Sequence, residues 1–280
     1  MNLILQSPTS DQSALHQLAA LVEPKRIINL ATGAIRCEDL QAISPDIKEN
    51  LANRAYQASV DVYWENARQH LTDFKLLAMD MDSTLITIEC IDEIADMQGL
   101  KPQVSEITEA AMRGEIAFAQ SLTRRVALLK GLSASALQQV FDERLKLSPG
   151  AEKLLHTVQT AGLKTLLVSG GFTFFTDRVK ANLKLDFSHS NQLEIVDGKL
   201  TGRVTGGIVD ADEKRRTVER VCAELGIATR QAIVMGDGAN DLAMMGIAGL
   251  SVAFRAKPIV RAQAHVALNF SGLDGLLNIL

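Results

Sequence analysis

The chain has 280 residues and a formal net charge of −4 at pH 7, with 47% hydrophobic and 22% charged residues. This composition is typical of a globular protein and excludes fibrous and disordered classes. The length suits about two domains, or one domain with an insertion. The mild excess of acidic residues argues against nucleic acid as a partner, while a small anionic substrate in one local pocket remains compatible with it.

Cysteine usage and hydropathy bear on where the protein works. Cys37, Cys90 and Cys222 are far apart and provide neither a disulfide framework nor a metal-binding spacing, so we expect free thiols in a reducing cytoplasm. No uncharged run approaches the ~20 apolar residues of a membrane span. The first basic residue, Lys25, comes too late for the basic region of a leader peptide. We therefore expect a cytoplasmic protein with no membrane partner.

Residues 1–72 are expected to form a small N-terminal α+β domain. An apolar strand starts at residues 3–5, a helical pattern covers 13–21, and a second strand covers 26–32. Pro45 opens a longer helical stretch through Ala55, Val60 and Trp64. No cluster of chemically reactive side chains occurs in this segment. The pattern favours a packing domain, through which two copies of the chain would form a homodimer, and a regulatory ligand-binding domain is the alternative.

From residue 74 the chain changes to short, continuous apolar runs that end in polar residues or glycines. Such runs occur at 76–79, 165–168, 232–235, 250–254 and 266–270. Continuous apolar strands are buried on both faces, which is typical of a parallel sheet covered by helices. Helical patterns separate them, at 150–161, 172–183, 214–225 and 241–247. Residues 73–280 are therefore expected to form an α/β, doubly wound, Rossmann-like core.

Two insertions interrupt this core. The segment 89–148 carries apolar stripes of helical period at 91–97, 104–112, 118–129 and 137–145. Because it follows the carboxyl end of the first strand, we expect a helical cap above the ligand site. In the segment 192–204, Asp197 and Gly198 separate two alternating stretches, which predicts a β-hairpin.

Asp80 and Asp82 directly follow the first core strand. Two residues apart in an extended chain, their carboxylates would project to the same side. Such charges share a site only when a cation compensates them or one carries a proton. The pair suits a nucleophile beside a metal together with a general acid and base. Taken alone, a solvated turn after a buried strand would give the same pattern.

The segment Gly236–Asp241 follows a second core strand. Its glycines permit a tight turn, and Asp237 should face the same sheet edge as Asp80. Carboxylate oxygens from two strand ends are the ligands that Mg²⁺ prefers, with Asn240 and Asp241 placed to orient ligands and water. As local structure, this segment is also a glycine-rich turn before a helix.

Two further features are ambiguous when taken alone. Ser169, Gly170 and Gly171 precede a predicted helix and offer a hydroxyl and free amides to an anion. Lys214 lies in a charged helical stretch and is equally explained as part of a solvated helix face.

The ordered motifs resemble those of the haloacid dehalogenase superfamily of phosphohydrolases, and of its phosphoserine phosphatase family in particular. The resemblance covers about residues 74–280. It rests on the stretches DMDSTLITIE at 80–89, CIDEIA at 90–95, AAMRGEIAFAQSLTRRVALLKG at 110–131, LVSGGF at 167–172 and GDGANDLAMM at 236–245. In related enzymes the N-terminal region is often an amino-acid-binding domain of the ACT type, of which residues 1–72 carry a degenerate hint.

The resemblance implies hydrolysis of O-phospho-L-serine through an aspartyl-phosphate, the last step of serine biosynthesis. Asp80 would be the nucleophile, and Asp82 would protonate the leaving oxygen and later activate water. The carboxylates of Asp80 and Asp237 and the backbone carbonyl of Asp82 would hold Mg²⁺, with Asp241 behind them.

The resemblance also assigns the phosphate-binding residues. Ser169 and Lys214 would bind the phosphoryl oxygens, Gly170 would donate a backbone N–H, and Asn240 would orient this side of the site.

For the amino-acid end, the resemblance implies that Glu89 meets the ammonium, Arg125 meets the carboxylate, and Met112 and Phe118 close the cap. Elementary chemistry agrees, since a zwitterion needs two opposite charges and arginine can bind a carboxylate through two hydrogen bonds. Without the resemblance, the two charged residues would be ordinary helix-surface groups and the two apolar ones plain core residues.

Two alternatives stay open at this stage. One is a phosphotransferase of the same fold, which would produce a new phosphoester instead of free phosphate. The other is an amino-acid sensor without catalysis, which the complete set of Asp80, Asp82, Lys214 and Asp237 argues against.

Overall fold

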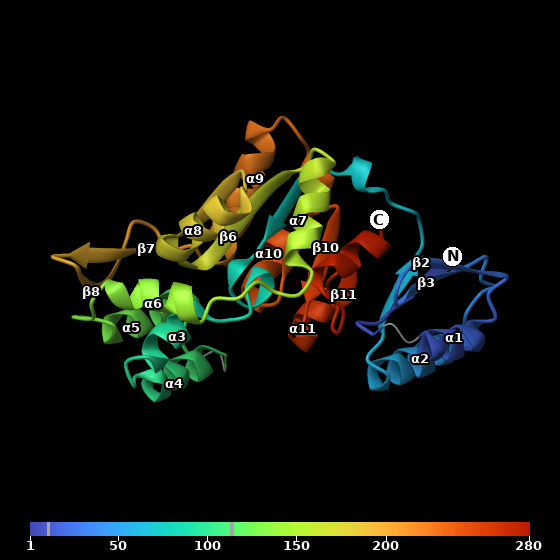
Figure 1. The fold of residues 1–280 in the computed structure, drawn as a ribbon, viewed down its shortest axis with the longest axis horizontal. Helices are drawn as coiled ribbons and strands as arrows, with labels where there is room; N and C mark the ends of the chain where they lie inside the picture. The colour runs from blue at the N-terminus through green and yellow to red at the C-terminus, as the bar shows by residue number, and fades with distance from the viewer. Residues whose placement is uncertain (10–11, 113–114) are drawn as a thin grey trace.

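A computed structural model describes residues 1–9, 12–112 and 115–280, and for Met112 it describes the backbone alone. The described residues form two sheets. Figure 1 shows a helical insertion at one end of the large sheet and an N-terminal unit at the other. Among the described residues, no helix is both long and apolar enough to cross a membrane.

The large sheet has seven strands in the order β11-β10-β9-β5-β6-β7-β8. They are β5 (Leu76–Met79), β6 (Lys164–Phe172), β7 (Phe187–Val196), β8 (Lys199–Thr205), β9 (Ala232–Gly236), β10 (Leu250–Phe254) and β11 (Val266–Leu268). All neighbours are parallel except β7 and β8. The predicted strands and the hairpin are confirmed, with β6 extending further than expected.

Strand β5 explains why continuous apolar runs form this sheet. Leu77 and Met79 belong to one buried apolar cluster, while Leu76 and Ala78 belong to another on the opposite face. Helices cover both faces, as the pattern predicts. These helices are α7 (Ala151–Thr160), α8 (Thr173–Leu183), α9 (Ala211–Glu224), α10 (Leu242–Met245) and α11 (Pro258–Arg261).

The insertion between β5 and β6 is helical, as expected. It consists of α3 (Cys90–Asp96), α4 (Lys101–Met112), α5 (Phe118–Leu128) and α6 (Ser135–Glu143). The β7–β8 hairpin supports it, because Gly131 donates its N–H to Leu200 and Leu200 donates to Leu132. Backbone bonds between the two insertions therefore fix the helical one relative to the sheet.

The N-terminal unit is a four-stranded antiparallel sheet in the order β2-β3-β1-β4 with two helices. Its elements are β1 (Asn2–Gln6), α1 (Ser13–Ala19), β2 (Arg26–Ala31), β3 (Ala34–Glu38), α2 (Pro45–Gln57) and β4 (Asp61–Glu65). Strands β3 and β4 were not anticipated from the sequence. The helix expected to run from Pro45 through Val60 and Trp64 was wrong beyond Gln57, because Ser59 takes a left-handed φ of +55° that ends the helix, and the chain then continues as β4. Leu3 and Leu5 pack under the helices in the unit's own core, whereas Ile4 belongs to a core cluster of the large sheet.

Asp61 attaches this unit to the C-terminal segment. Its carboxylate, on a residue that is 2% exposed, accepts backbone N–H bonds from Asn269, Phe270 and Ser271 at 2.7–3.2 Å. Gln6 accepts a further bond from Asn278. The N-terminal unit is therefore docked through buried polar contacts as well as apolar ones.

Candidate active site

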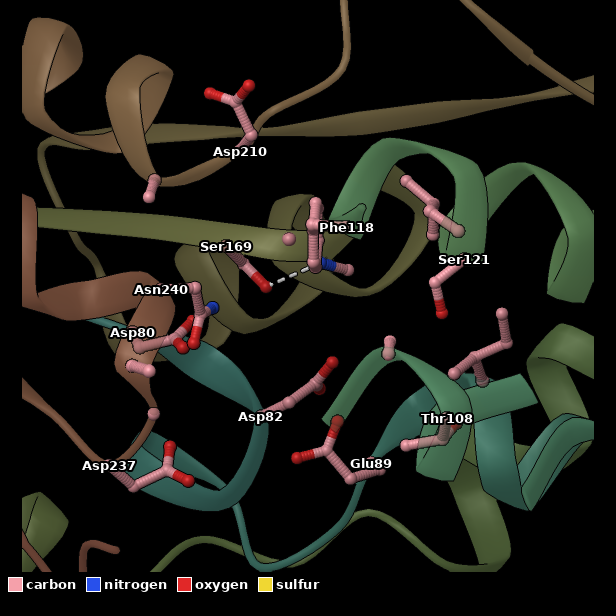
Figure 2. Close-up of a pocket in the computed structure, with 18 of the residues that line it drawn as sticks. Asp80, Asp82, Glu89, Thr108, Phe118, Ser121, Ser169, Asp210, Asp237 and Asn240 are labelled. Atoms are coloured by element: carbon pink, nitrogen blue, oxygen red, sulfur yellow. Dashed lines mark hydrogen bonds between the residues drawn. The ribbon is translucent and has the colours of Figure 1, made fainter. Parts of the chain in front are cut away.

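The predicted polar residues meet at the carboxyl edge of the central strands. The strand order places β5 between β9 and β6, so the residues that follow all three strands share one edge. Here they line a cavity of about 940 Å³. Figure 2 shows Asp80, Asp237 and Ser169 of the core on one side of this cavity and Ser121 of the helical insertion on the other.

Asp80 is held by a buried ion pair. The Nζ of Lys214 lies 2.7 Å from Asp80 Oδ2 and 2.8 Å from Asp241 Oδ1, and the lysine is fully buried. Burial lowers the pKa of Lys214, but the charges of Asp241 and Asp80 outweigh it and the net shift is upward. Lys214 is therefore a permanent cation directly behind Asp80, on the inner wall of the site.

Asp82 reaches the cavity through a wide turn rather than an extended strand. Residues Met81–Leu85 form a single turn of π type, closed by the bond from Ile86 N–H to the Met81 carbonyl at 3.0 Å. Within it Ser83 has a φ of +56°, a left-handed conformation that L-residues rarely adopt. This turn, and not strand alternation, brings the carboxylate of Asp82 to the same cavity as Asp80.

The environment of Asp82 favours a protonated carboxyl group. Burial, followed by the negative charge of Glu89, raises the pKa of Asp82 to about 8. Its Oδ1 atom is buried and has no hydrogen-bond partner among the described residues. Gly171 is required beside it, because a Cβ there would lie 2.9 Å from Asp82 Oδ2. A carboxyl group of this kind can give a proton to a substrate near neutral pH.

Three carboxylates are suited to a divalent cation. Oxygens of Asp80, Asp237 and Asp241 lie within 4.8 Å of one another, and Lys214 compensates one of the three charges. Burial, then the charge of Asp241, raises the pKa of Asp237 to about 7. The remaining negative charge in this buried site is uncompensated, and a hard divalent cation bound to the carboxylate oxygens would neutralise it. The three carboxylates therefore fit a metal ion.

The turn after β9 is built around Asp241. Its Oδ2 accepts N–H bonds from Asp237 and Gly238 at 3.1 and 3.0 Å. A Cβ on Gly236 would lie 2.4 Å from Asp241 Oδ2, and a Cβ on Gly238 would lie 2.2 Å from Asn240 Oδ1. Gly236 is therefore required for the close approach of Asp241, and a side chain at Gly238 would displace the Asn240 side chain from its position.

The end of β6 provides a polar pocket beside Asp80. Ser169 is fully buried and its Oγ accepts the N–H of Gly171 at 2.9 Å. Asn191 on β7 donates to the Gly170 carbonyl and accepts from Val209 N–H, both at 2.8 Å. Asn191 therefore ties this pocket to the segment that leads into α9, which carries Lys214.

The helical insertion contributes charged groups to the opposite wall. Glu89 accepts a 2.7 Å bond from Ser83 Oγ, and burial raises its pKa. Burial lowers the pKa of Arg125, while the nearby charges of Asp92 and Glu89 oppose this shift. The Nε of Arg125 and the Oδ1 of Asp92 are buried without a hydrogen-bond partner in the described part of the chain. This wall thus offers one cation and several anions to a ligand.

Most of the predicted residues meet at this cavity. Its lining includes Asp80, Asp82, Glu89, Phe118, Arg125, Ser169, Gly170, Asp237 and Asn240. Lys214 and Asp241 are fully buried behind the lining. The backbone of Met112 ends α4, and its side chain lies outside the described residues.

Other residues of the site escaped the sequence analysis. Thr84 is fully buried and donates to Asp237 Oδ1 at 3.0 Å, and Ser83 and Asn191 make the contacts given above. Ser83 and Thr84 lie inside the first motif, which was a usable signal. Asn191 lies just before the predicted hairpin segment 192–204 and had no local signal, because its partners, the Gly170 carbonyl and the Val209 N–H, come from two other segments.

Comparisons with known proteins agree with this geometry. A family profile described as haloacid dehalogenase-like hydrolase matches residues 74–249. A phosphoserine phosphatase from Polaromonas sp. strain JS666 is 59% identical over 215 residues, which are 75% of this chain and 91% of that protein.

Solved structures extend the agreement to the three-dimensional fold. A HAD family hydrolase from Salmonella enterica serovar Typhi is 35% identical with a TM-score of 0.85, covering 100% of this chain and 98% of that one. A phosphoserine phosphatase solved as a phospho-aspartyl intermediate analogue is 38% identical with a TM-score of 0.69, covering 73% and 97%. The chain belongs to the haloacid dehalogenase-like hydrolases and, within them, to the phosphoserine phosphatase family.

Proposed function

We propose that the protein hydrolyses O-phospho-L-serine to L-serine and phosphate, the last step of serine biosynthesis. The observation that carries the proposal is the division of charge across one cavity. Asp80 and Asp82 lie on the core side, and Glu89 and Arg125 lie on the side of the helical insertion. Phosphoserine has a matching division, with a phosphate at one end and an ammonium and a carboxylate at the other. The relatives reported above are named phosphoserine phosphatases.

Asp80 is the proposed nucleophile. A carboxylate oxygen attacks phosphorus, the bond to the serine oxygen breaks, and an aspartyl-phosphate forms on Asp80. Burial and the charge of Asp241 raise the pKa of Asp80, and Lys214, at 2.7 Å from Asp80 Oδ2, opposes this rise. The lysine also lies where negative charge develops. Ser169 Oγ and the N–H of Gly170 would bind phosphoryl oxygens, with Asn240 positioned beside them.

Asp82 is the proposed general acid and base. Its raised pKa of about 8 provides a proton for the departing serine oxygen. The resulting carboxylate then accepts a proton from water, whose oxygen attacks the phosphorus and releases phosphate and free Asp80. The cycle returns the proton to Asp82, so no other acid or base is needed.

A divalent cation, which we propose is Mg²⁺, fits beside Asp80. The carboxylates of Asp80 and Asp237 and the backbone carbonyl of Asp82 would hold it, with Asp241 behind them. When bound, it would offset negative charge on the phosphoryl group. Thr84 and the amides around Asp241 keep the carboxylates oriented for this role.

The helical insertion, the proposed cap, selects the substrate. Glu89 would bind the ammonium and Arg125 the carboxylate. Phe118 would help to exclude water, with Met112 the remaining proposed cap residue. A Cβ on Gly170 would lie 3.0 Å from the Phe118 ring, so the ring already reaches the phosphate pocket and the cap has little further to close.

Phosphate release from a panel of phosphoesters tests the proposal, with Mg²⁺ or a chelator present. We expect O-phospho-L-serine to be preferred over p-nitrophenyl phosphate, and chelation to abolish turnover. Asp80→Asn is the inactive control. Absence of free phosphate from phosphoserine, or formation of a new phosphoester instead, contradicts the proposal.

We also propose the chain's organisation and setting. Residues 1–72 would form a domain that joins two copies, since β2 lies at an open edge of its sheet, and residues 73–280 would form the catalytic domain. Cys37, Cys90 and Cys222 are free and buried, which suits the cytoplasm. Light scattering of the intact chain measures the oligomeric state, and a monomer at micromolar concentration contradicts the dimer.

A further inference from the structure

Ser121 is a buried polar residue in the cap wall that the proposed mechanism does not use. It lies on α5 one turn before Arg125, is 1% exposed, and lines the cavity. Figure 2 shows its hydroxyl directed into the cavity. The Oγ atom has no hydrogen-bond partner among the described residues.

Neighbouring hydroxyls on the cap helices behave differently. Thr123 donates to the carbonyl of Ala119 at 2.8 Å, and Thr108 donates to that of Val104 at 3.0 Å. This bond to the preceding turn is the usual solution for a hydroxyl inside a helix. Ser121 does not make it, although its own N–H bonds to Ala117 in the regular way. The hydroxyl is therefore left available on the cavity side of a normal helix.

An unpartnered buried hydroxyl is unfavourable, because it has lost water without a replacement. A ligand that reaches it restores the missing bond. One turn further along the same helix, the Nε of Arg125 is also buried without a partner among the residues that the structure describes. The two groups together form a pair of adjacent donors on one face of α5.

We propose that Ser121 is a specificity-determining residue whose hydroxyl donates to the substrate carboxylate beside Arg125. The inference rests on the proposed function, since it assumes an amino-acid phosphoester. Two adjacent donors match the two oxygens of a carboxylate. The substrate ammonium would have separate partners, because the acidic residues that suit it, Glu89 and Asp92, lie at the start of α3 and not on α5.

The test compares two substrates that differ only in the carboxylate. The kcat/KM of wild type and of Ser121→Ala is measured with O-phospho-L-serine and with O-phosphoethanolamine. We expect Ser121→Ala to lose about tenfold with phosphoserine, mainly through a higher KM, because a hydrogen bond to a charged group is lost. With phosphoethanolamine it should stay within about twofold of wild type. Thr123→Ala, on the same helix, should match wild type with both substrates.

The outcomes separate the inference from the function. A wild type that does not hydrolyse phosphoserine overturns the proposed function itself. With an active wild type, an unchanged kcat/KM of Ser121→Ala for phosphoserine, or a loss of equal or greater size with phosphoethanolamine, overturns the role of Ser121. If Ser121→Ala does not fold, Ser121→Cys repeats the comparison with a similar volume and a weaker donor.

Discussion

Replacement of Lys214 by methionine tests how far one buried cation supports the site. The ammonium lies between Asp80 and Asp241 at 2.7 and 2.8 Å, and all three side chains are at most 8% exposed. Removing it strands two buried carboxylates, and breaking such a pair typically costs about 3–5 kcal/mol. For a chain of this size that corresponds to a fall of about 6–20 °C in the unfolding midpoint. Turnover should also be abolished, because Asp80 loses its partner.

The assay is thermal and urea unfolding in the presence of a chelator, so that no divalent cation replaces the missing charge. Lys199→Met, at an exposed lysine, is the matched control and should stay within about 0.5 kcal/mol of wild type. Asp80→Asn combined with Lys214→Met removes one of the stranded charges and should recover part of the lost stability. A Lys214→Met protein as stable as the control, or a double variant no more stable than the single one, refutes the reasoning.

Further substitutions probe the remaining parts of the structure. Arg125→Ala should reduce kcat/KM for phosphoserine by about 30- to 150-fold, since a charged hydrogen-bond partner is lost. The reduction for p-nitrophenyl phosphate, which has no carboxylate, should be far smaller. Equal losses with both substrates would assign Arg125 to cap folding. Rapid-quench trapping should find no phosphoenzyme with Asp80→Asn. Asp82→Asn should form phosphoenzyme more readily from p-nitrophenyl phosphate than from phosphoserine, because the aryl leaving group needs no acid. Equal phosphoenzyme formation from the two substrates would contradict the role of Asp82. Asn191→Ala removes both bonds that tie the phosphate pocket to the α9 segment, and we expect kcat to fall by about tenfold with thermal stability lowered by about 1–2 kcal/mol; unchanged kcat would show that the tie is not needed for catalysis. Asp61→Ala leaves three N–H groups, one buried and two partly buried, without their acceptor. It should cost about 2–4 kcal/mol in urea unfolding, and an unchanged stability would show that the N-terminal unit folds independently of this contact.

The sequence alone indicated the class of the core and the location of its site. Continuous apolar runs are a local property, and burial on both faces is their direct consequence, so the parallel sheet follows from the pattern of residues itself. The residues that end Leu76–Met79 and Ala232–Gly236 therefore had to lie at one edge. The individual roles of Glu89 and Arg125 came from the family resemblance, because a lone charge on a helix has no local signature.

Contacts between distant segments were beyond the reach of the sequence pattern. Local periodicity does not set the order of strands in a sheet, and the pairing of β9 with β5 is what brings Asp80 and Asp241 together. Lys214 reaches both carboxylates from α9, a separate helix. The same holds for Asn191, which joins two loops, and for Asp61, which accepts bonds from the far end of the chain. Burial and charge compensation arise only when those segments pack together, so the tertiary structure alone decides which carboxylates lie against Lys214 and how far burial raises the pKa of Asp82.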